Sequence, residues 1–170
     1  MAHAVVRTDL MTGTDVRSEL VSVRYQPSAT MTAIDNGNFV VLGDLETGSR
    51  TVYKGATPAA NTDISKVVLV ATPELMYDER KKGLDEFENE AGTIARGYRL
   101  HSHDIFSVTA DALTLSVSGK TAPEVGNVVE LQANTKAKVV ASATSGSTVL
   151  GKIIDINIVG KYTFYVIEIA

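Results

Sequence analysis

Short runs in which apolar and polar residues alternate recur along most of the chain, and this period of two predicts β-strands. The clearest run, residues 19–25, places Val21, Val23 and Tyr25 on one face and Ser22 and Arg24 on the other. Comparable runs predict strands at residues 29–34, 39–42, 49–53, 66–71, 98–100, 105–109, 113–117, 127–131, 137–141, 150–159 and 162–169. Regularly spaced short strands of this kind are typical of a small barrel or sandwich.

Two turns carry more specific predictions. Asn36-Gly37 between strand-like runs is a strong hairpin signal, because both central residues of a type I′ turn need positive φ. Gly160-Lys161 joins the last two runs in a second hairpin. Residues 162–169 are apolar on both faces, so we expect this strand to lie centrally in a sheet or to pack against a neighbouring subunit.

The segment 73–93 is predicted to be helical or an acidic loop, unlike the strands around it. Residues 72–74 (Thr-Pro-Glu) provide a hydroxyl N-cap, a proline at the first helical position and an acid near the positive end of the helix dipole. Two lysines before Gly83 suit a helix end. Beyond it, Leu84, Phe87 and Ala91 have helical spacing among acidic residues, which predicts either a second short helix or an acidic surface loop with one anchoring aromatic.

The predicted fold is therefore mainly β: a small β-barrel or sandwich with a short helical/acidic insertion and a flexible N-terminal arm. Residues 1–18 are polar with no sustained period, which predicts the arm rather than a core element. Residues 19–170 then form a β-rich domain. Within it, an N-terminal β region (19–72), a helical insertion (73–93) and a C-terminal β-barrel (94–170) are the alternative division.

Composition supports this fold and narrows the chemistry. Val, Ile and Thr together number 49 of 170 residues against 12 Leu, which favours strands. Cysteine is absent, so disulfides and thiolate sites are excluded. The net charge of −4 argues against a nucleic-acid partner. The charge is unevenly distributed, since residues 61–100 carry 14 of the 36 charged groups. The longest apolar run is five residues, far short of a membrane span, and we expect no secretory signal.

Candidate chemical sites are few. His101 and His103 would share one face of a strand, which two metal ligands could use, but a polar loop before Ile105 is the favoured interpretation. The acidic residues of 74–90 lack the spacing of an EF-hand loop, so a solvated or salt-bridging surface is favoured there. Neither a Ser-His-Asp order nor a phosphate-binding glycine loop is present. We therefore expect no enzyme activity, no cofactor and no metal.

Several blocks of the sequence resemble a known class of proteins. They lie at residues 74–80, 84–92, 95–98, 125–131, 149–154 and 161–169. The middle block, 84–92 with 95–98, is fairly specific, whereas the pattern from 126–131 to 151–154 is a generic small-barrel signature. They resemble small proteins encoded among the head genes of tailed bacteriophages, which we take to be capsid decoration (cement) or head-fibre proteins. The resemblance covers roughly residues 20–170.

This resemblance implies a structural virion protein, made in the bacterial host cytoplasm, that binds the capsid exterior and stabilises it by bridging major capsid protein subunits. A homotrimer is expected, with a monomer as the alternative. The arm, about residues 2–18, would order on the capsid by adding a strand to an exposed edge, so its deletion should leave a folded protein that no longer binds. The candidate contact residues lie in the arm, the acidic segment and the last strand: Val5, Val6, Arg7, Leu10, Tyr77, Arg80, Phe87 and Tyr165.

Two other classes of function stay open. A tail or baseplate component, or a carbohydrate-binding head module, would need an exposed aromatic platform, for which Tyr53, Tyr77 and Tyr98 are the candidates. An intracellular β-barrel enzyme or ligand-binding protein would need a concave pocket around His101, His103 and Asp104.

Overall fold

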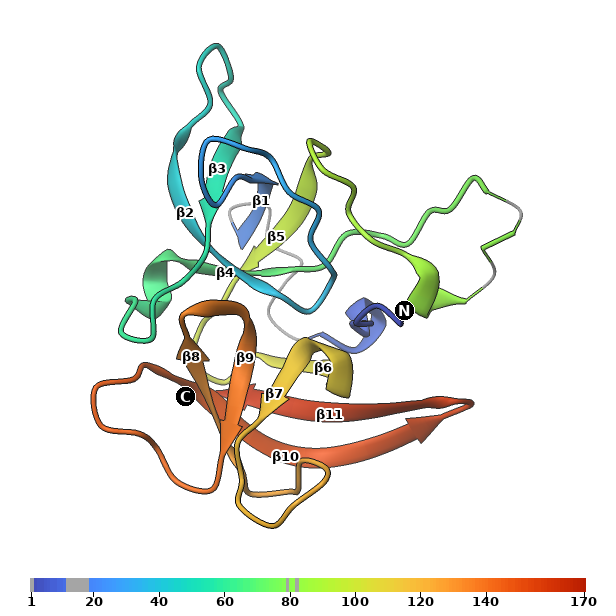
Figure 1. The fold of residues 1–170 in the computed structure, drawn as a ribbon, viewed down its shortest axis with the longest axis vertical. Helices are drawn as coiled ribbons and strands as arrows, with labels where there is room; N and C mark the ends of the chain where they lie inside the picture. Colours follow the sequence, from blue (N-terminus) through green and yellow to red (C-terminus); the bar gives the residue numbers. More distant parts are fainter. Residues whose placement is uncertain (1, 12–18, 79, 82) are drawn as a thin grey trace.

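The computed structural model describes residues 2–11, 19–78, 80–81 and 83–170, which form two packed β layers (Figure 1). The first is a closed five-stranded barrel in the order β1-β3-β2-β4-β5. Its strands are β1 (Leu20–Tyr25), β2 (Phe39–Leu45), β3 (Val52–Ala56), β4 (Val67–Val70) and β5 (Ala95–Arg99). The barrel closes because β1 pairs with β3 in parallel and with β5 in antiparallel orientation.

The second layer is a six-stranded sheet in the order β6-β11-β10-β8-β9-β7. Its strands are β6 (Ile105–Thr109), β7 (Leu113–Leu115), β8 (Val128–Gln132), β9 (Asn134–Val140), β10 (Val149–Val159) and β11 (Tyr162–Ile169). The helical elements are single 3₁₀ turns: η1 (Thr8–Leu10), η3 (Ile64–Lys66), η4 (Leu84–Glu86) and η5 (Ala110–Ala112). The mainly β prediction is confirmed, and the chain divides near residue 100 into a barrel and a sheet.

Two apolar clusters stabilise this arrangement. The barrel interior is filled by Val23, Ile34, Val40, Val68, Val70 and Ala95. A larger cluster lies between the barrel wall and the sheet, where Phe39 meets Phe106 edge to face with ring centroids 6.0 Å apart. Strand β4 serves both, because Val68 and Val70 point into the barrel while Val67 and Leu69 face the sheet. This explains why residues 67–71 form a continuous apolar run.

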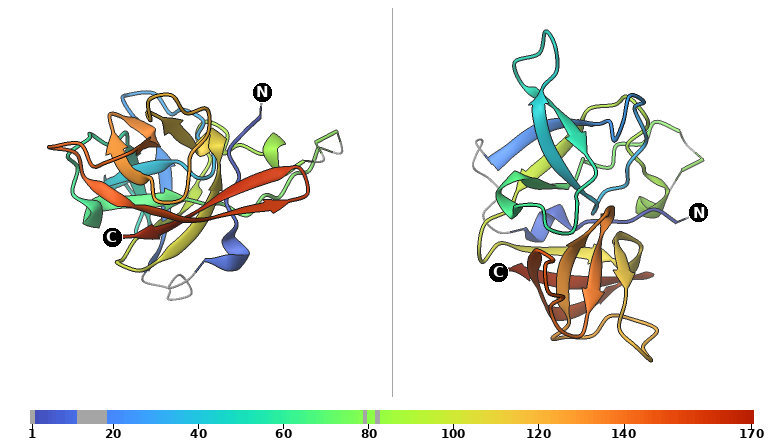
Figure 2. Two further views of the ribbon diagram at one scale, coloured as in Figure 1. Left: turned by 90° about the horizontal axis from the view of Figure 1, so that it is seen from below. Right: turned by 60° about the vertical axis from the view of Figure 1, so that its left-hand side comes forward.

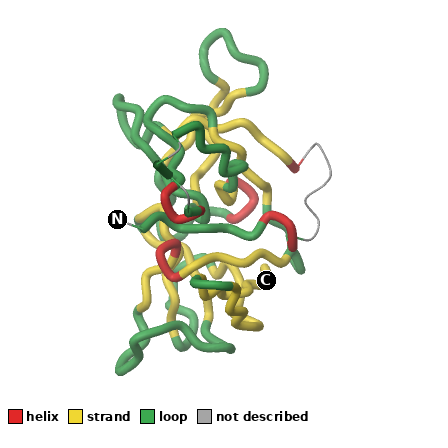
Figure 3. Tube along the Cα trace, turned by 90° about the vertical axis from the view of Figure 1, so that its right-hand side faces the viewer, coloured by secondary structure: helices red, strands yellow, loops and turns green. Residues whose placement is uncertain are grey.

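The predicted N-terminal arm is wrong for the described residues 4–6. Ala4, Val5 and Val6 are buried, and Val6 forms an antiparallel bridge with Val108 of β6. The N-terminal segment runs between the two layers and adds to the edge of its own sheet (Figures 2 and 3). The arm was expected to add a strand to an exposed edge on the capsid. In the structure it pairs instead with β6 of its own chain. The remainder of the predicted arm, residues 12–18, lies outside the described residues.

The predicted helix after residue 72 is also wrong, since the described residues of 73–81 form an irregular loop. The Thr72 hydroxyl does not cap a helix. It accepts a hydrogen bond from the backbone N of Arg96 (3.0 Å), near the start of β5. Residues 84–86 form only the 3₁₀ turn η4, so the acidic-loop alternative holds here. Phe87 is half-buried, as an anchoring aromatic would be.

The two predicted hairpins have different outcomes. The β10–β11 hairpin is confirmed, with Val159 opposite Tyr162, and β11 lies between β10 and β6 as its two apolar faces predicted. Gly37 does adopt positive φ (80°), but residues 29–34 do not pair with β2. Ile34 instead bridges to Asn89, 55 residues away, which no local pattern indicates.

Candidate functional site

The residues between β4 and β5, which we call the 72–94 loop, leave the barrel and return to it. At its base the fully buried Asn36 side chain binds both polar backbone groups of Thr72: its Oδ1 accepts from Thr72 N (2.9 Å) and its Nδ2 donates to Thr72 O (2.8 Å). Asn89 Nδ2 donates to the same Asn36 oxygen (3.1 Å). Two buried amides therefore hold the outgoing and returning halves together.

The far end of the loop is fixed to the β10–β11 turn through Asp85. Its Oδ1 accepts from Lys161 Nζ (2.7 Å) and from the Tyr162 hydroxyl (2.6 Å). The hydrogen bond from Lys161 and, to a smaller extent, the one from Tyr162 lower the pKa of Asp85 to about 2. Its backbone oxygen accepts from His3 N (2.8 Å), which adds the N-terminal segment to the same junction. The loop is long but it is anchored at both ends.

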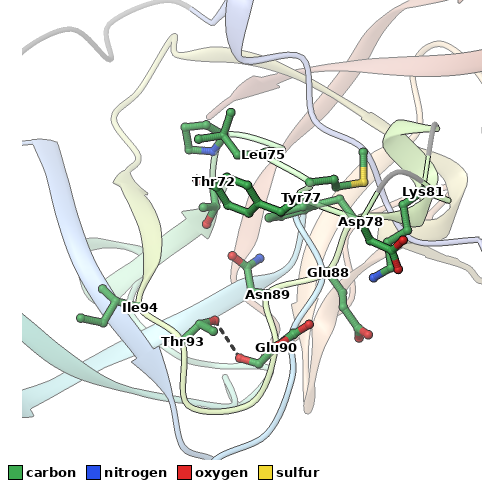
Figure 4. A pocket seen from close by; sticks show the side chains of 13 residues that line it. Thr72, Leu75, Tyr77, Asp78, Lys81, Glu88, Asn89, Glu90, Thr93 and Ile94 are labelled. Atoms are coloured by element: carbon green, nitrogen blue, oxygen red, sulfur yellow. Dashed lines mark hydrogen bonds between the residues drawn. The ribbon is translucent and has the colours of Figure 1, made fainter.

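Between these anchors the loop encloses a groove of about 470 Å³. Leu75 and Tyr77 belong to the outgoing half, while Glu90 and Ile94 belong to the returning half, where Thr93 Oγ1 donates to Glu90 O (Figure 4). Leu75 is 69% exposed, Tyr77 94% and Ile94 48%. Exposed apolar side chains that gather in one patch, as these three do at the groove, can mark an interaction surface.

Charge surrounds this apolar surface. The lining includes Asp78, Glu88 and Glu90 with one described cation, Lys81. Arg80 lies beside the groove and forms an ion pair with Asp78 (2.8 Å), which lowers the pKa of that carboxyl. Carboxylates beside exposed apolar side chains suit a partner surface that offers apolar side chains flanked by Lys or Arg.

A second group of exposed apolar residues lies on β10. Its first part pairs with β8, but Asp155–Val159 pair only with β11 among the described strands. The outer backbone edge of this stretch is therefore open. Ile158 is 76% exposed and Val159 47%. The hairpin projects to one side of the sheet (Figure 1).

The predicted contact residues divide between surface and core. Tyr77 and Arg80 are exposed and Phe87 lines the groove, so these three meet at one surface. Val5, Val6 and Tyr165 lie in the interior, which corrects the expectation that they face a partner. Burial also raises the pKa of Tyr165.

The two remaining contact candidates lie near the N-terminus. Arg7 is half-buried, forms an ion pair with Asp9 (2.6 Å) and lies 5.8 Å from the centre of the Phe164 ring. Leu10 belongs to η1, and its side chain is outside the described part of the structure. Of the arm candidates whose side chains are described, Val5, Val6 and Arg7 thus make contacts within the chain.

The histidine pair occupies the turn between β5 and β6, not one face of a strand. His101 Nε2 contacts Glu19 Oε2 (2.5 Å), and this carboxylate raises the pKa of His101. His103, with φ of 72°, contacts Glu168 (3.2 Å) instead. The polar-loop interpretation is confirmed, because the two rings have different partners.

The aromatic-platform candidates are not equivalent either. Tyr98 is buried and Tyr53 half-buried, which leaves Tyr77 as the one fully exposed ring of the three. Within the described residues, no helix is long and apolar enough to span a membrane. Comparisons of the chain with protein-family models, with curated proteins and with solved structures gave no match.

Proposed function

We propose that this chain is a structural protein of a tailed-phage virion that binds the capsid exterior and bridges neighbouring major capsid protein subunits. One observation carries the proposal. Residues 87–90 of the fairly specific block of the phage-head resemblance line the groove, together with residues 75–78 of the block at 74–80. The part of the sequence that suggests the function is the part that exposes apolar surface.

The groove is the proposed contact with the major capsid protein. Leu75 and Tyr77 offer apolar area to the partner, and the carboxylate of Glu90 would pair with a basic side chain of the partner. The loop is held by Asn36 and Asp85, so little conformational entropy is lost when a partner binds it. Many copies on a repetitive shell then add up to tight retention.

The expected self-association is assigned to the open edge of β10. Residues 155–159 pair with no described strand on their outer edge, so a strand from a second copy would add there, and Ile158 and Val159 offer apolar area beside it. The groove and this edge lie on different elements. One copy could therefore contact both the capsid and a neighbouring copy.

Sedimentation with empty, expanded capsids tests the function. We expect saturable co-pelleting at a fixed ratio to the major capsid protein. Replacing both Leu75 and Tyr77 with Ser should reduce the bound amount at least tenfold, since central apolar anchors dominate binding energy. Val125→Ser, which alters an exposed apolar residue on a distant turn, is the matched control and should bind normally.

Three outcomes contradict parts of this proposal. Absence of binding to expanded shells would reject capsid decoration in favour of a tail role or a free binding module. Equal binding by the groove variant would reject the groove but keep the function. Loss of binding in the Val125→Ser control would reveal a contact surface other than the groove.

A further inference from the structure

Three potential metal ligands from distant parts of the chain meet beside the groove. They are His3 of the N-terminal segment, Asp35 before β2, and Glu88 in the 72–94 loop. One ligand atom of each lies within 4.8 Å of the other two, and all three residues are half-buried. His3 Nδ1 is 2.7 Å from Asp35 Oδ1.

The backbone explains why the two carboxylates lie together. Ile34 and Asn89 form an antiparallel bridge through two hydrogen bonds, Ile34 N to Asn89 O (2.9 Å) and Asn89 N to Ile34 O (3.0 Å). The next residues along each segment, Asp35 and Glu88, are then directly opposite. Like charges in that position repel each other, and a cation between them would offset the repulsion.

The third ligand is held in place independently. His3 N donates to Asp85 O (2.8 Å), and the bridge between Val6 and Val108 fixes the chain three residues later. His3 therefore reaches the two carboxylates from a segment whose backbone is already positioned. A site of this kind is formed by the fold before an ion arrives.

We propose that His3 Nδ1, Asp35 and Glu88 bind a divalent transition-metal ion, with Zn²⁺ the best fit. One imidazole nitrogen and two carboxylate oxygens form a borderline ligand set that suits Zn²⁺ better than Ca²⁺ or Mg²⁺, which prefer oxygen ligands only. Ligand atoms around a tetrahedral Zn²⁺ lie roughly 3.3 Å apart, given metal–ligand distances of about 2 Å. Small side-chain rotations reach this from the present separations, and a water would be the fourth ligand.

The site revises the expectation that the chain binds no metal, and it does not depend on the proposed function. Its consequence is structural. The ion would tie the N-terminal segment and the stretch before β2 to the 72–94 loop. Since Glu88 also lines the groove, metal binding would stiffen one of the groove walls.

The test uses the full chain, freed of metal with EDTA and titrated with ZnCl₂ in a calorimeter, with thermal unfolding followed in Zn²⁺ and in EDTA. We expect one Zn²⁺ per chain and a higher Tm in Zn²⁺, because an ion that binds only the folded state stabilises it. Millimolar Mg²⁺ should not displace the Zn²⁺. Glu88→Gln preserves size and the backbone bridge, and should reduce affinity about a hundredfold or more and abolish the Tm shift.

The matched control is Glu90→Gln, two residues along the same loop, which should bind Zn²⁺ as the unaltered chain does. His3→Gln should behave like Glu88→Gln. Absence of saturable binding would overturn the proposal. An unchanged Zn²⁺ affinity in Glu88→Gln would also overturn it, because it would place the ion on His3 alone or on the turn that holds His101 and His103.

Discussion

The barrel and the sheet both bury apolar residues but differ in the strand edges that they leave open. The barrel is closed, so each of its five strands has a neighbour on both sides. The sheet is open, with β6 and β7 as outer strands and β10 extending beyond β8. Open edges invite pairing, and this chain uses one of them for its own N-terminal segment and leaves the end of β10 exposed.

This difference shows where a further strand can pair with the molecule. Because the barrel is closed, its strands offer no free edge, and the barrel projects instead through loops such as the 72–94 loop between β4 and β5 and the connection between β2 and β3 (Figure 1). The sheet must cover its edges or share them. We therefore expect damage at the covered edge to affect folding and damage at the exposed edge to affect assembly.

The largest effect is expected at the covered edge. Val6→Asp places a charge in the apolar cluster between the layers, where Val6 is buried against β6. The free energy of unfolding should fall by at least about 3 kcal/mol, measured by urea denaturation. Thr8→Asp, an exposed position two residues later, is the control and should change stability little.

A free N-terminal arm would predict that its deletion leaves a folded protein. The buried N-terminal segment predicts a loss of stability instead. Deleting residues 2–11 should cost more than Val6→Asp, because it removes Ala4 and Val5 as well and uncovers the β6 edge. A deletion variant that stays folded with an unchanged unfolding midpoint would show that the N-terminal segment contributes no stability.

The N-terminal segment illustrates what the sequence could and could not predict. Strands β6 and β11 were predicted with their observed bounds, because alternation is a local signal. The partner of a segment is not local. Val5 and Val6 were the only sign that a polar stretch enters the core, and nothing near them points to Val108, a hundred residues away.

In the 72–94 loop the local sequence predicts a helix, but tertiary contacts favour an irregular loop. Thr72-Pro73-Glu74 has the chemistry of a helix start, yet tertiary contacts with Asn36 and Arg96 engage both polar backbone groups and the hydroxyl of Thr72. Of the groove, Tyr77, Arg80 and Phe87 were predicted as contacts from the sequence. The meeting of His3, Asp35 and Glu88 was not, because their separations of 32 and 53 residues carry no spacing pattern.

The second prediction concerns a buried charge in the sheet, whereas the described cluster inside the barrel is made of apolar residues. Glu130 of β8 is fully buried; its carboxylate accepts from Thr144 N (2.9 Å) and from Lys138 Nζ (3.1 Å). Burial alone would raise the pKa of Glu130, but these donors together lower it below its usual value. The carboxylate therefore organises the sheet by holding the 141–148 turn to β8.

Glu130→Ala leaves Thr144 N without its acceptor and opens a cavity, so we expect a loss of about 2–3 kcal/mol in urea denaturation at pH 7. Glu124→Ala breaks an exposed ion pair with Lys120 and should cost less than about 0.5 kcal/mol. Because the pKa is lowered in the folded state, the stabilisation by Glu130 is present above its unfolded pKa and is lost on acidification. Equal losses in the two variants would show that the buried charge is not structural.

The third prediction tests the exposed edge. Ile158→Lys adds a charge to the open side of β10, a substitution that protects natural edge strands from pairing. We expect the oligomer to dissociate, with the dissociation constant rising at least about tenfold in sedimentation velocity, while Tm changes little. Val125→Lys is the control. A monomer at all concentrations in the unaltered chain would reject the edge as a self-association site.

The smallest effect is expected where the two regions are joined through the 72–94 loop. Asp85→Asn removes the anion that Lys161 and Tyr162 hold, while Asn still offers an oxygen to one donor. The pKa of Asp85 is about 2 in the folded chain and near 3.8 without these partners. Its contribution is therefore present above about pH 4 and is lost as the pH falls towards 2.

The Tm of Asp85→Asn should accordingly lie a few degrees below that of the unaltered chain at pH 7 and approach it near pH 2. The ion pair is partly open to water, so screening keeps the effect small, and 0.5 M NaCl should reduce it further. A difference in Tm that stays constant from pH 7 to pH 2 would assign the role of Asp85 to packing rather than charge. The loop would then be fixed to the sheet by shape alone, and the groove would keep its form in acid.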